Sequence, residues 1–159
     1  MSVKAAAPAL GRVVADFRLP TTGSTPFSLR SLRGQAVVLY FYPRDDTPGC
    51  TLEGQDFQRL LPAFKRAAAR VFGISRDSLA AHHKFCGKFG FSFELLADET
   101  GAVCKQFDVM RMKNMYGRKL LGIERSTFLI DAAGKLRREW RKLKVTGHAD
   151  EVLEAIKAL

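Results

Sequence analysis

Cys50 is the residue whose type and position most directly allow chemistry. It ends the segment Thr47-Pro48-Gly49-Cys50, which follows an apolar run at residues 36–42 and precedes apolar residues at helical spacing. In the first turn of a helix, unpaired backbone N–H groups and the positive end of the helix dipole stabilise a thiolate, which is a nucleophile. The same spacing turns the sulfur inward, shielded but reachable. Because a cysteine on an apolar helix face is commonly only a small hydrophobic side chain, Cys50 alone leaves both interpretations open.

Several segments around Cys50 share their pattern with a known family. The spacing Pro43-x-x-x-Thr47-x-x-Cys50 resembles the active-site pattern of the peroxiredoxins, and the run TPGCT followed by Glu53 is similar to the bacterioferritin comigratory protein (peroxiredoxin Q) subgroup. Further segments resemble the same subgroup: GISRDS at 73–78, NMYG at 114–117 and GIERSTFLID at 122–131. The resemblance extends through nearly the whole chain and places Arg125 at the position of the family's active-site arginine.

This resemblance implies a thiol-dependent peroxidase that acts on hydrogen peroxide and organic hydroperoxides. The Cys50 thiolate would attack one peroxide oxygen, which gives a sulfenic acid and releases water or an alcohol. Arg125, the Thr47 hydroxyl and the backbone N–H of Cys50 would hold the two oxygens and stabilise the charge on the departing one, while Pro43 screens the sulfur from water. The implied reaction uses no metal and no organic cofactor.

The sulfenic acid must be reduced before another turnover, and the resemblance offers Cys86 for this step. Many members of the subgroup carry a resolving cysteine five residues after the peroxidatic one, where this chain has Gln55. Another branch keeps it in the second helix, at the position of Cys86, which implies an intramolecular disulfide with Cys50 that thioredoxin or a similar dithiol protein reduces. Helical periodicity by itself also allows Cys86 to be a buried structural residue. Cys104 is interpreted as a packing residue.

The proposed disulfide places a demand on the backbone. The Cα atoms of a disulfide lie within about 7 Å of each other, and two packed helices do not guarantee this separation. We therefore expect the first turn of the Cys50 helix and the helix around Cys86 to open locally after oxidation, helped by Gly87 and Gly90. Because both cysteines belong to one chain, a monomer can complete the cycle.

The elements that must position these residues follow from the apolar pattern. Continuous apolar runs predict buried strands at 36–42 and 70–74, each followed by an amphipathic helix. Thr47 is predicted to cap the first helix with its hydroxyl and Asp77 to cap the second, and Pro62 is expected to kink or restart the first. The remaining predicted elements are short strands at 17–19 and 26–29, a strand at 93–96, a short helix at 99–107, hairpin strands at 123–130 and 135–143, and a helix at 148–159.

This order predicts one domain over residues 1–159, of the α/β class. Strand and helix alternate before a hairpin and a final helix, which gives a central mixed β-sheet flanked by helices, the thioredoxin-like layout, with an N-terminal β-hairpin extension. Three cysteines, an odd number, do not match the disulfide framework of a secreted domain. The N-terminus lacks the apolar run of a signal peptide and no stretch approaches the roughly 20 apolar residues of a membrane span, so we expect a cytoplasmic protein without a membrane partner.

The formal net charge of +10 leaves several partners open. Basic residues concentrate at 111–119, which contains Tyr116, and at 135–144, which contains Trp140. Cations interleaved with aromatic residues could bind nucleic acid, but such stretches are more often solvated faces, and attraction of an acidic reductase protein is another ordinary explanation. We therefore expect no nucleic-acid partner.

Two further interpretations are weighed against the peroxidase. His82 and His83 could direct ligands to one metal, but we expect a solvated pair on a helix flank and no metal, since matching ligands are not evident nearby. A thiol-disulfide oxidoreductase would carry a Cys-x-x-Cys pair, which this chain lacks, and Ser126 stands where thioredoxins have a proline. A redox sensor or nucleic-acid-binding module would use Cys50 stoichiometrically, without turnover.

Overall fold

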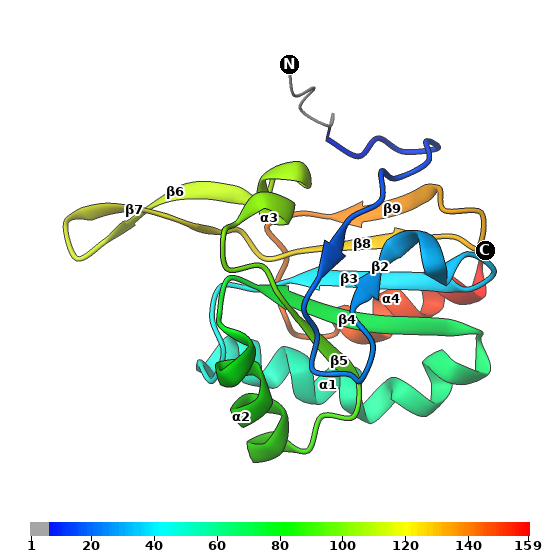
Figure 1. The fold of residues 1–159 in the computed structure, drawn as a ribbon, viewed down its shortest axis with the longest axis horizontal. Helices are drawn as coiled ribbons and strands as arrows, with labels where there is room; N and C mark the ends of the chain where they lie inside the picture. The colour runs from blue at the N-terminus through cyan, green and yellow to red at the C-terminus, as the bar shows by residue number, and fades with distance from the viewer. Residues whose placement is uncertain (1–6) are drawn as a thin grey trace.

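The computed structural model describes residues 7–159, and within this range a five-stranded sheet organises the chain. Its strand order is β5-β4-β3-β8-β9, with β3, β4 and β5 parallel and with β8 and β9 each antiparallel to its neighbour (Figure 1). The strands are β3 (Ala36–Phe41), β4 (Ala69–Ser75), β5 (Glu94–Ala97), β8 (Ser126–Ile130) and β9 (Leu136–Trp140). The prediction of a mixed central sheet is confirmed.

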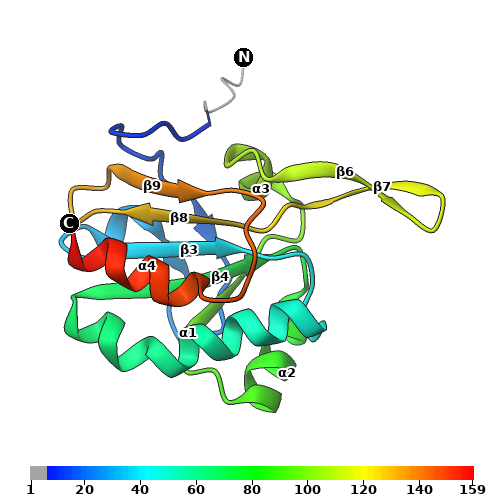
Figure 2. The same ribbon diagram turned by 180° about the vertical axis from the view of Figure 1, so that it is seen from behind.

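Helices cover both faces of this sheet, which explains why its central strand is apolar without alternation. Val38 and Tyr40 of β3 pack in the same cluster as α1, α2 and α4, whereas Val37, Leu39 and Phe41 pack with α3 and the N-terminal strands. Figure 2 shows α1 and α4 side by side on one face. The helices are α1 (Pro48–Arg66), α2 (Leu79–Phe89), α3 (Ala102–Gln106) and α4 (His148–Lys157). Strands buried on both faces have near-continuous apolar sequences.

The N-terminal hairpin is present, as predicted. Its strands β1 (Arg18–Leu19) and β2 (Phe27–Ser28) pair antiparallel and lead into a 3-10 helix, η1 (Leu29–Leu32). Phe17 and Phe27 stack with ring centroids 5.2 Å apart, and both belong to the cluster on the α3 face. The hairpin therefore closes one side of the core.

Two predicted helix caps require correction, and the helix restart considered at Pro62 does not occur. Thr47 is the N-cap residue of α1, but its side chain makes no capping hydrogen bond, and its hydroxyl instead donates to the Arg44 carbonyl at 2.8 Å. Ser78 rather than Asp77 caps α2, and its Oγ accepts from the Ala81 N–H. α1 continues through Pro62 to Arg66 as one helix. The Asp77 carboxylate instead accepts from the Asp45 N–H and the Ser75 hydroxyl.

A second hairpin was not predicted. β6 (Met110–Met115) and β7 (Arg118–Ile123) pair antiparallel and extend away from the body of the protein as an arm (Figure 1). Tyr116 and Gly117 form its tip with φ of 54° and 76°, the left-handed values of a two-residue hairpin turn. Residues 111–119 were interpreted only as a basic stretch, and the apolar Leu120 and Leu121 that follow were not recognised as part of a strand. No helix within residues 7–159 is long and apolar enough to span a membrane.

Candidate active site

Cys50 lies at the start of α1, directly beyond the carboxyl end of β3. The parallel strands β3 and β4 end together here, so the loop at residues 43–47 and the first turn of α1 stand over the edge of the sheet. The Cys50 side chain is turned inward and is 2% exposed. N–H groups of a first helical turn have few partners inside the helix, so the positive end of the helix dipole lies at the turn that carries Cys50.

Arg125 contacts the Cys50 sulfur. It directly precedes β8, whose Ser126 is paired with Phe41 at the end of β3, and this pairing brings position 125 to the loop. Arg125 Nη2 donates to Cys50 Sγ at 3.4 Å. A Cβ atom at Gly49 would lie 3.1 Å from Nη2, so the glycine lets the guanidinium approach. A fixed cation thus lies beside the sulfur in a site largely closed to water.

Glu53 is a further member of the site whose role the sequence analysis did not assign. Its side chain is 1% exposed, and Oε1 accepts from Arg125 Nη1 at 2.6 Å. Burial raises the pKa of Glu53 from 4.5 to about 7, although the Arg125 charge opposes this change. Oε2 has no hydrogen-bond partner among the described residues. The position of Glu53 in the sequence could have indicated that it belongs to the site, because a residue three after Cys50 lies on the same helix face.

The floor of the site is apolar and aromatic. Tyr40 of β3 stacks on Phe57 of α1 with ring centroids 4.6 Å apart, and its hydroxyl is buried. Burial, then the charges of Glu53 and Cys50, raise the pKa of Tyr40 well above its usual value, which keeps the phenol neutral. In surroundings of low dielectric, a single guanidinium has a larger effect on a thiolate than it has in water.

Thr47 and Pro43 lie in the loop that borders Cys50. The Thr47 hydroxyl donates its hydrogen to the Arg44 carbonyl, so its oxygen can only accept a hydrogen bond from a substrate. This differs from the expectation that the hydroxyl stabilises developing negative charge, since only a donor can do that. Pro43 is half-buried two residues after β3 ends. Among the described side chains, Arg125 is the one that hydrogen-bonds to the sulfur, and Thr47 and Pro43 do not.

The other two cysteines have different surroundings. Cys86 of α2 is half-buried against the cluster that contains Cys50, and burial raises the pKa of its thiol. Cys104 of α3 is fully buried in the cluster on the other face of the sheet. Burial and then the Asp98 carboxylate raise the pKa of Cys104 strongly. All three cysteines are free thiols.

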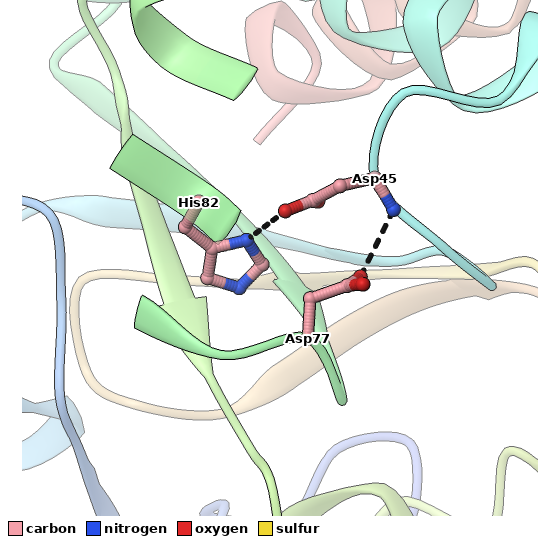
Figure 3. Close-up of side chains that lie close together, drawn as sticks. All are labelled: Asp45, Asp77 and His82. Atoms are coloured by element: carbon pink, nitrogen blue, oxygen red, sulfur yellow. Dashed lines mark hydrogen bonds and ion pairs between the residues drawn. The ribbon is translucent and has the colours of Figure 1, made fainter. Parts of the chain in front are cut away.

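His82 contradicts its predicted environment. It is fully buried rather than solvated, and the carboxylates of Asp45 and Asp77 come within reach of it from the loop and from the end of β4 (Figure 3). One ligand atom from each of the three residues lies within 4.8 Å of the others. However, His82 Nδ1 is bonded to Asp45 Oδ2 at 2.7 Å and Nε2 to the Leu96 carbonyl at 2.9 Å. Its two nitrogens are therefore engaged within the protein, and the group gives no support to a metal role.

Known proteins share this sequence and this arrangement. The AhpC/TSA family model matches residues 10–139. The chain is 53% identical over 143 residues to peroxiredoxin Bcp of Xanthomonas campestris pv. campestris, covering 90% of this chain and 89% of the relative. It is 41% identical to peroxiredoxin Bcp of Bacillus subtilis, covering 93% of this chain and 94% of the relative.

Solved structures agree with these relatives. A structure of Xanthomonas campestris peroxiredoxin Q matches with a TM-score of 0.85 at 53% identity, covering 89% of this chain and 90% of that one. A Xylella fastidiosa PrxQ mutant structure matches with a TM-score of 0.89 at 44% identity, covering 95% and 96%. The chain therefore belongs to the AhpC/TSA family, in its bacterioferritin comigratory protein or peroxiredoxin Q group, and is a peroxidase of the thioredoxin-like fold.

Proposed function

We propose that Cys50 is the peroxidatic cysteine of this peroxidase. Its thiolate attacks one oxygen of a hydroperoxide, the O–O bond breaks, and Cys50 becomes a sulfenic acid while water or an alcohol leaves. The observation that carries this assignment is the hydrogen bond from Arg125 Nη2 to Cys50 Sγ at 3.4 Å inside a nearly closed site. The Arg125 guanidinium attracts negative charge on the sulfur, and thiolates are the reactive form of cysteine.

The neighbouring groups have separate roles in this proposal. Arg125 and the backbone N–H of Cys50 donate to the peroxide oxygens and stabilise the charge that moves onto the departing one. The Thr47 oxygen accepts the peroxide hydrogen, since its own proton is bonded to Arg44. Glu53 orients the Arg125 guanidinium through the 2.6 Å hydrogen bond. Pro43 shields the sulfur on the loop side.

Cys86 resolves the sulfenic acid in this proposal. Position 55 is glutamine, which leaves Cys86 and Cys104 as the candidates. Cys86 packs against the cluster that contains Cys50, whereas Cys104 lies across the sheet. Structures exist of two cysteine-to-serine variants of the Xanthomonas protein, at positions with the same sequence separation as Cys50 and Cys86. Local opening of both helices, ending at Gly90 in the second, would bring the sulfurs together.

The remaining parts of the proposal concern substrates and partners. A structure of the Xanthomonas bacterioferritin comigratory protein is titled for its alkyl peroxide reduction activity, which supports organic hydroperoxides beside hydrogen peroxide as substrates here. Thioredoxin or a similar dithiol protein would reduce the Cys50–Cys86 disulfide. Because one chain carries both cysteines, we propose that the protein works as a monomer. We also propose a cytoplasmic location, since thioredoxin and glutathione keep thiols reduced there.

The test is peroxide consumption with thioredoxin in excess by the wild type and three variants. We expect Cys50→Ser to abolish activity, Cys86→Ser to lose thioredoxin-dependent turnover, and Cys104→Ser to retain the wild-type rate. Full turnover by Cys86→Ser would overturn the resolving assignment, and activity in Cys50→Ser would overturn the peroxidatic one. Consumption of about one equivalent of peroxide by the wild type would identify a stoichiometric sensor instead.

A further inference from the structure

Two side-chain contacts join the active-site loop, residues 43–47, to helix α2. The first is between Asp45 Oδ2 and His82 Nδ1 at 2.7 Å, with the side chains 6% and 0% exposed. The second is between Asp46 and Lys88 at 2.9 Å, with the side chains 49% and 60% exposed. Exposed ion pairs contribute little, whereas buried hydrogen bonds to charged groups contribute substantially. The Asp45–His82 pair is therefore the stronger connection.

Each polar side-chain atom of the Asp45–His82 pair has a hydrogen-bond partner, and Figure 3 shows the bond between His82 Nδ1 and Asp45. His82 Nε2 lies 2.9 Å from the carbonyl oxygen of Leu96, which can only accept, so Nε2 carries a hydrogen. Nδ1 and Asp45 Oδ2 then share one further proton. Asp45 Oδ1 accepts from the Tyr42 hydroxyl at 2.6 Å, and the Asp45 N–H donates to Asp77 Oδ2 at 2.9 Å. The loop is thus anchored to α2 through the Asp45 carboxylate.

Beside this pair a crevice lies between the loop and α2. The crevice there has a volume of about 360 Å³ and is lined by Arg44, Asp45 and Asp46 of the loop and by Lys84, Phe85 and Lys88 of α2. His82 lies about one helical turn before Cys86, and the loop runs directly into the turn that carries Cys50. A contact between the loop and α2 therefore acts on both cysteine-bearing segments.

We propose that Asp45 and His82 are positioning residues that hold these two segments in the closed arrangement that reacts with peroxide, and that their separation gates the disulfide step. The proposal rests on the proposed function, in which Cys86 resolves Cys50. While the pair is joined, Cys50 stays beside Arg125. Once it separates, the loop and α2 open together and Cys86 reaches the oxidised sulfur.

Separation of Asp45 from His82 determines which of two reactions the Cys50 sulfenic acid undergoes. In the first, the Cys86 thiolate attacks the Cys50 sulfur, the S–S bond forms as the S–O bond breaks, and the departing hydroxide takes a proton to become water. In the second, another hydroperoxide oxidises the sulfenic acid to a sulfinic acid and leaves as water or an alcohol. A joined pair delays the first reaction and so favours the second at high peroxide.

Four variants test the pair. Asp45→Ala removes it, whereas Asp45→Asn can keep its geometry, because the amide N–H donates to Nδ1 of a neutral His82. Tyr42→Phe removes the other side-chain hydrogen bond that Asp45→Ala loses. Lys88→Ala removes the exposed contact between the same two segments and is the matched control.

Three measurements follow each variant. These are the rate of disulfide formation after a single equivalent of peroxide, the peroxide concentration that converts half of Cys50 to sulfinic acid, and hydrogen exchange of the reduced protein. For Asp45→Ala we expect the disulfide formation rate, the half-oxidation peroxide concentration and the hydrogen-exchange rate each to rise about tenfold. The exchange rates should rise together in residues 43–54 and 79–89. For Asp45→Asn, Tyr42→Phe and Lys88→Ala we expect changes within about threefold.

Equal behaviour of Asp45→Ala and Lys88→Ala would overturn the proposal. Faster exchange confined to α2, with residues 43–54 unchanged, would also overturn it, because a merely structural role in the helix would produce that pattern. If the wild type forms no Cys50–Cys86 disulfide, the proposed resolution fails, while joint exchange of the two segments in the reduced protein still decides whether the pair couples them.

Discussion

Cys50 and Cys104 are both buried cysteines near helix starts, on opposite faces of one sheet, yet their surroundings have opposite charge. Cys50 has the Arg125 guanidinium 3.4 Å from its sulfur. Cys104 has the Asp98 carboxylate, which accepts its backbone N–H at 2.8 Å and raises the pKa of its thiol together with burial. The comparison teaches that burial and a helix start do not by themselves make a reactive cysteine. The charge beside the sulfur distinguishes them.

The largest expected difference is in alkylation. In the folded, reduced protein at neutral pH, we expect iodoacetamide to modify Cys50 at least about a hundredfold faster than Cys104, because only the thiolate reacts. Mass spectrometry of peptides from timed samples measures both rates. In denaturant the two rates should converge within about threefold, since the charged neighbours are then lost. Similar alkylation rates of Cys50 and Cys104 in the folded protein would contradict the claim that the charge beside the sulfur distinguishes them.

The next effect comes from the cation itself. Arg125→Met should lower kcat/KM for hydrogen peroxide about a hundredfold, because it removes a donor to the thiolate and to the departing oxygen. Stopped-flow peroxide kinetics measure this. Arg76→Met is the control, since Arg76 lies on the Cys104 side of the molecule and lowers the pKa of that thiol. Its rate should stay within twofold of the wild type. An equal loss in both variants would indicate a general electrostatic effect.

A smaller effect is expected for Glu53→Gln. Loss of the carboxylate that orients Arg125 should lower kcat/KM about tenfold, measured by the same stopped-flow kinetics. A glutamine keeps the size of the side chain and can still accept from the guanidinium, so the loss should be less than for Arg125→Met. A variant as fast as the wild type would contradict the orienting role.

The same variant tests how the site responds to pH. The pKa of Glu53 in the folded protein, about 7, lies above its usual 4.5, so the folded state binds this proton more tightly than the unfolded chain. The stability from the bound proton is complete below pH 4.5 and is lost as the pH rises through 7. Between about pH 5 and 8, the unfolding free energy of the wild type should therefore fall relative to Glu53→Gln, as urea denaturation measures. Parallel profiles would contradict the shifted pKa.

The smallest effect on activity is expected at Asp98. Its carboxylate accepts the N–H groups of Val103 and Cys104, so Asp98→Asn should destabilise the fold by about 1–3 kcal/mol in chemical denaturation. The pKa of Cys104 should fall, because the carboxylate charge is removed, but peroxidase activity should not change. Faster peroxide consumption by this variant would mean that Cys104 takes part in the reaction.

Sequence reasoning performed differently for local and non-local features. The central sheet and the position of Cys50 at the start of a helix were predicted, because a continuous apolar run and a proline at the first helical position are local signals. The β6–β7 arm was missed, since most of its side chains are exposed and so lack the continuous apolar signal of a buried strand. The Thr47 and Asp77 caps were predicted wrongly. The Thr47 hydroxyl donates to the nearby Arg44 carbonyl, and the Asp77 carboxylate accepts from Ser75 and from the more distant Asp45 N–H.

The sequence by itself therefore determined which cysteine begins a helix behind a buried strand, and its motifs led to the family. Only the tertiary structure decided what surrounds each thiol. Arg125 reaches Cys50 because β8 pairs with β3, and Asp45 reaches His82 because the loop after β3 lies against α2. These contacts join segments far apart in the chain. Helix and strand periodicity describe neighbours along the backbone, whereas electrostatics depends on distance in space.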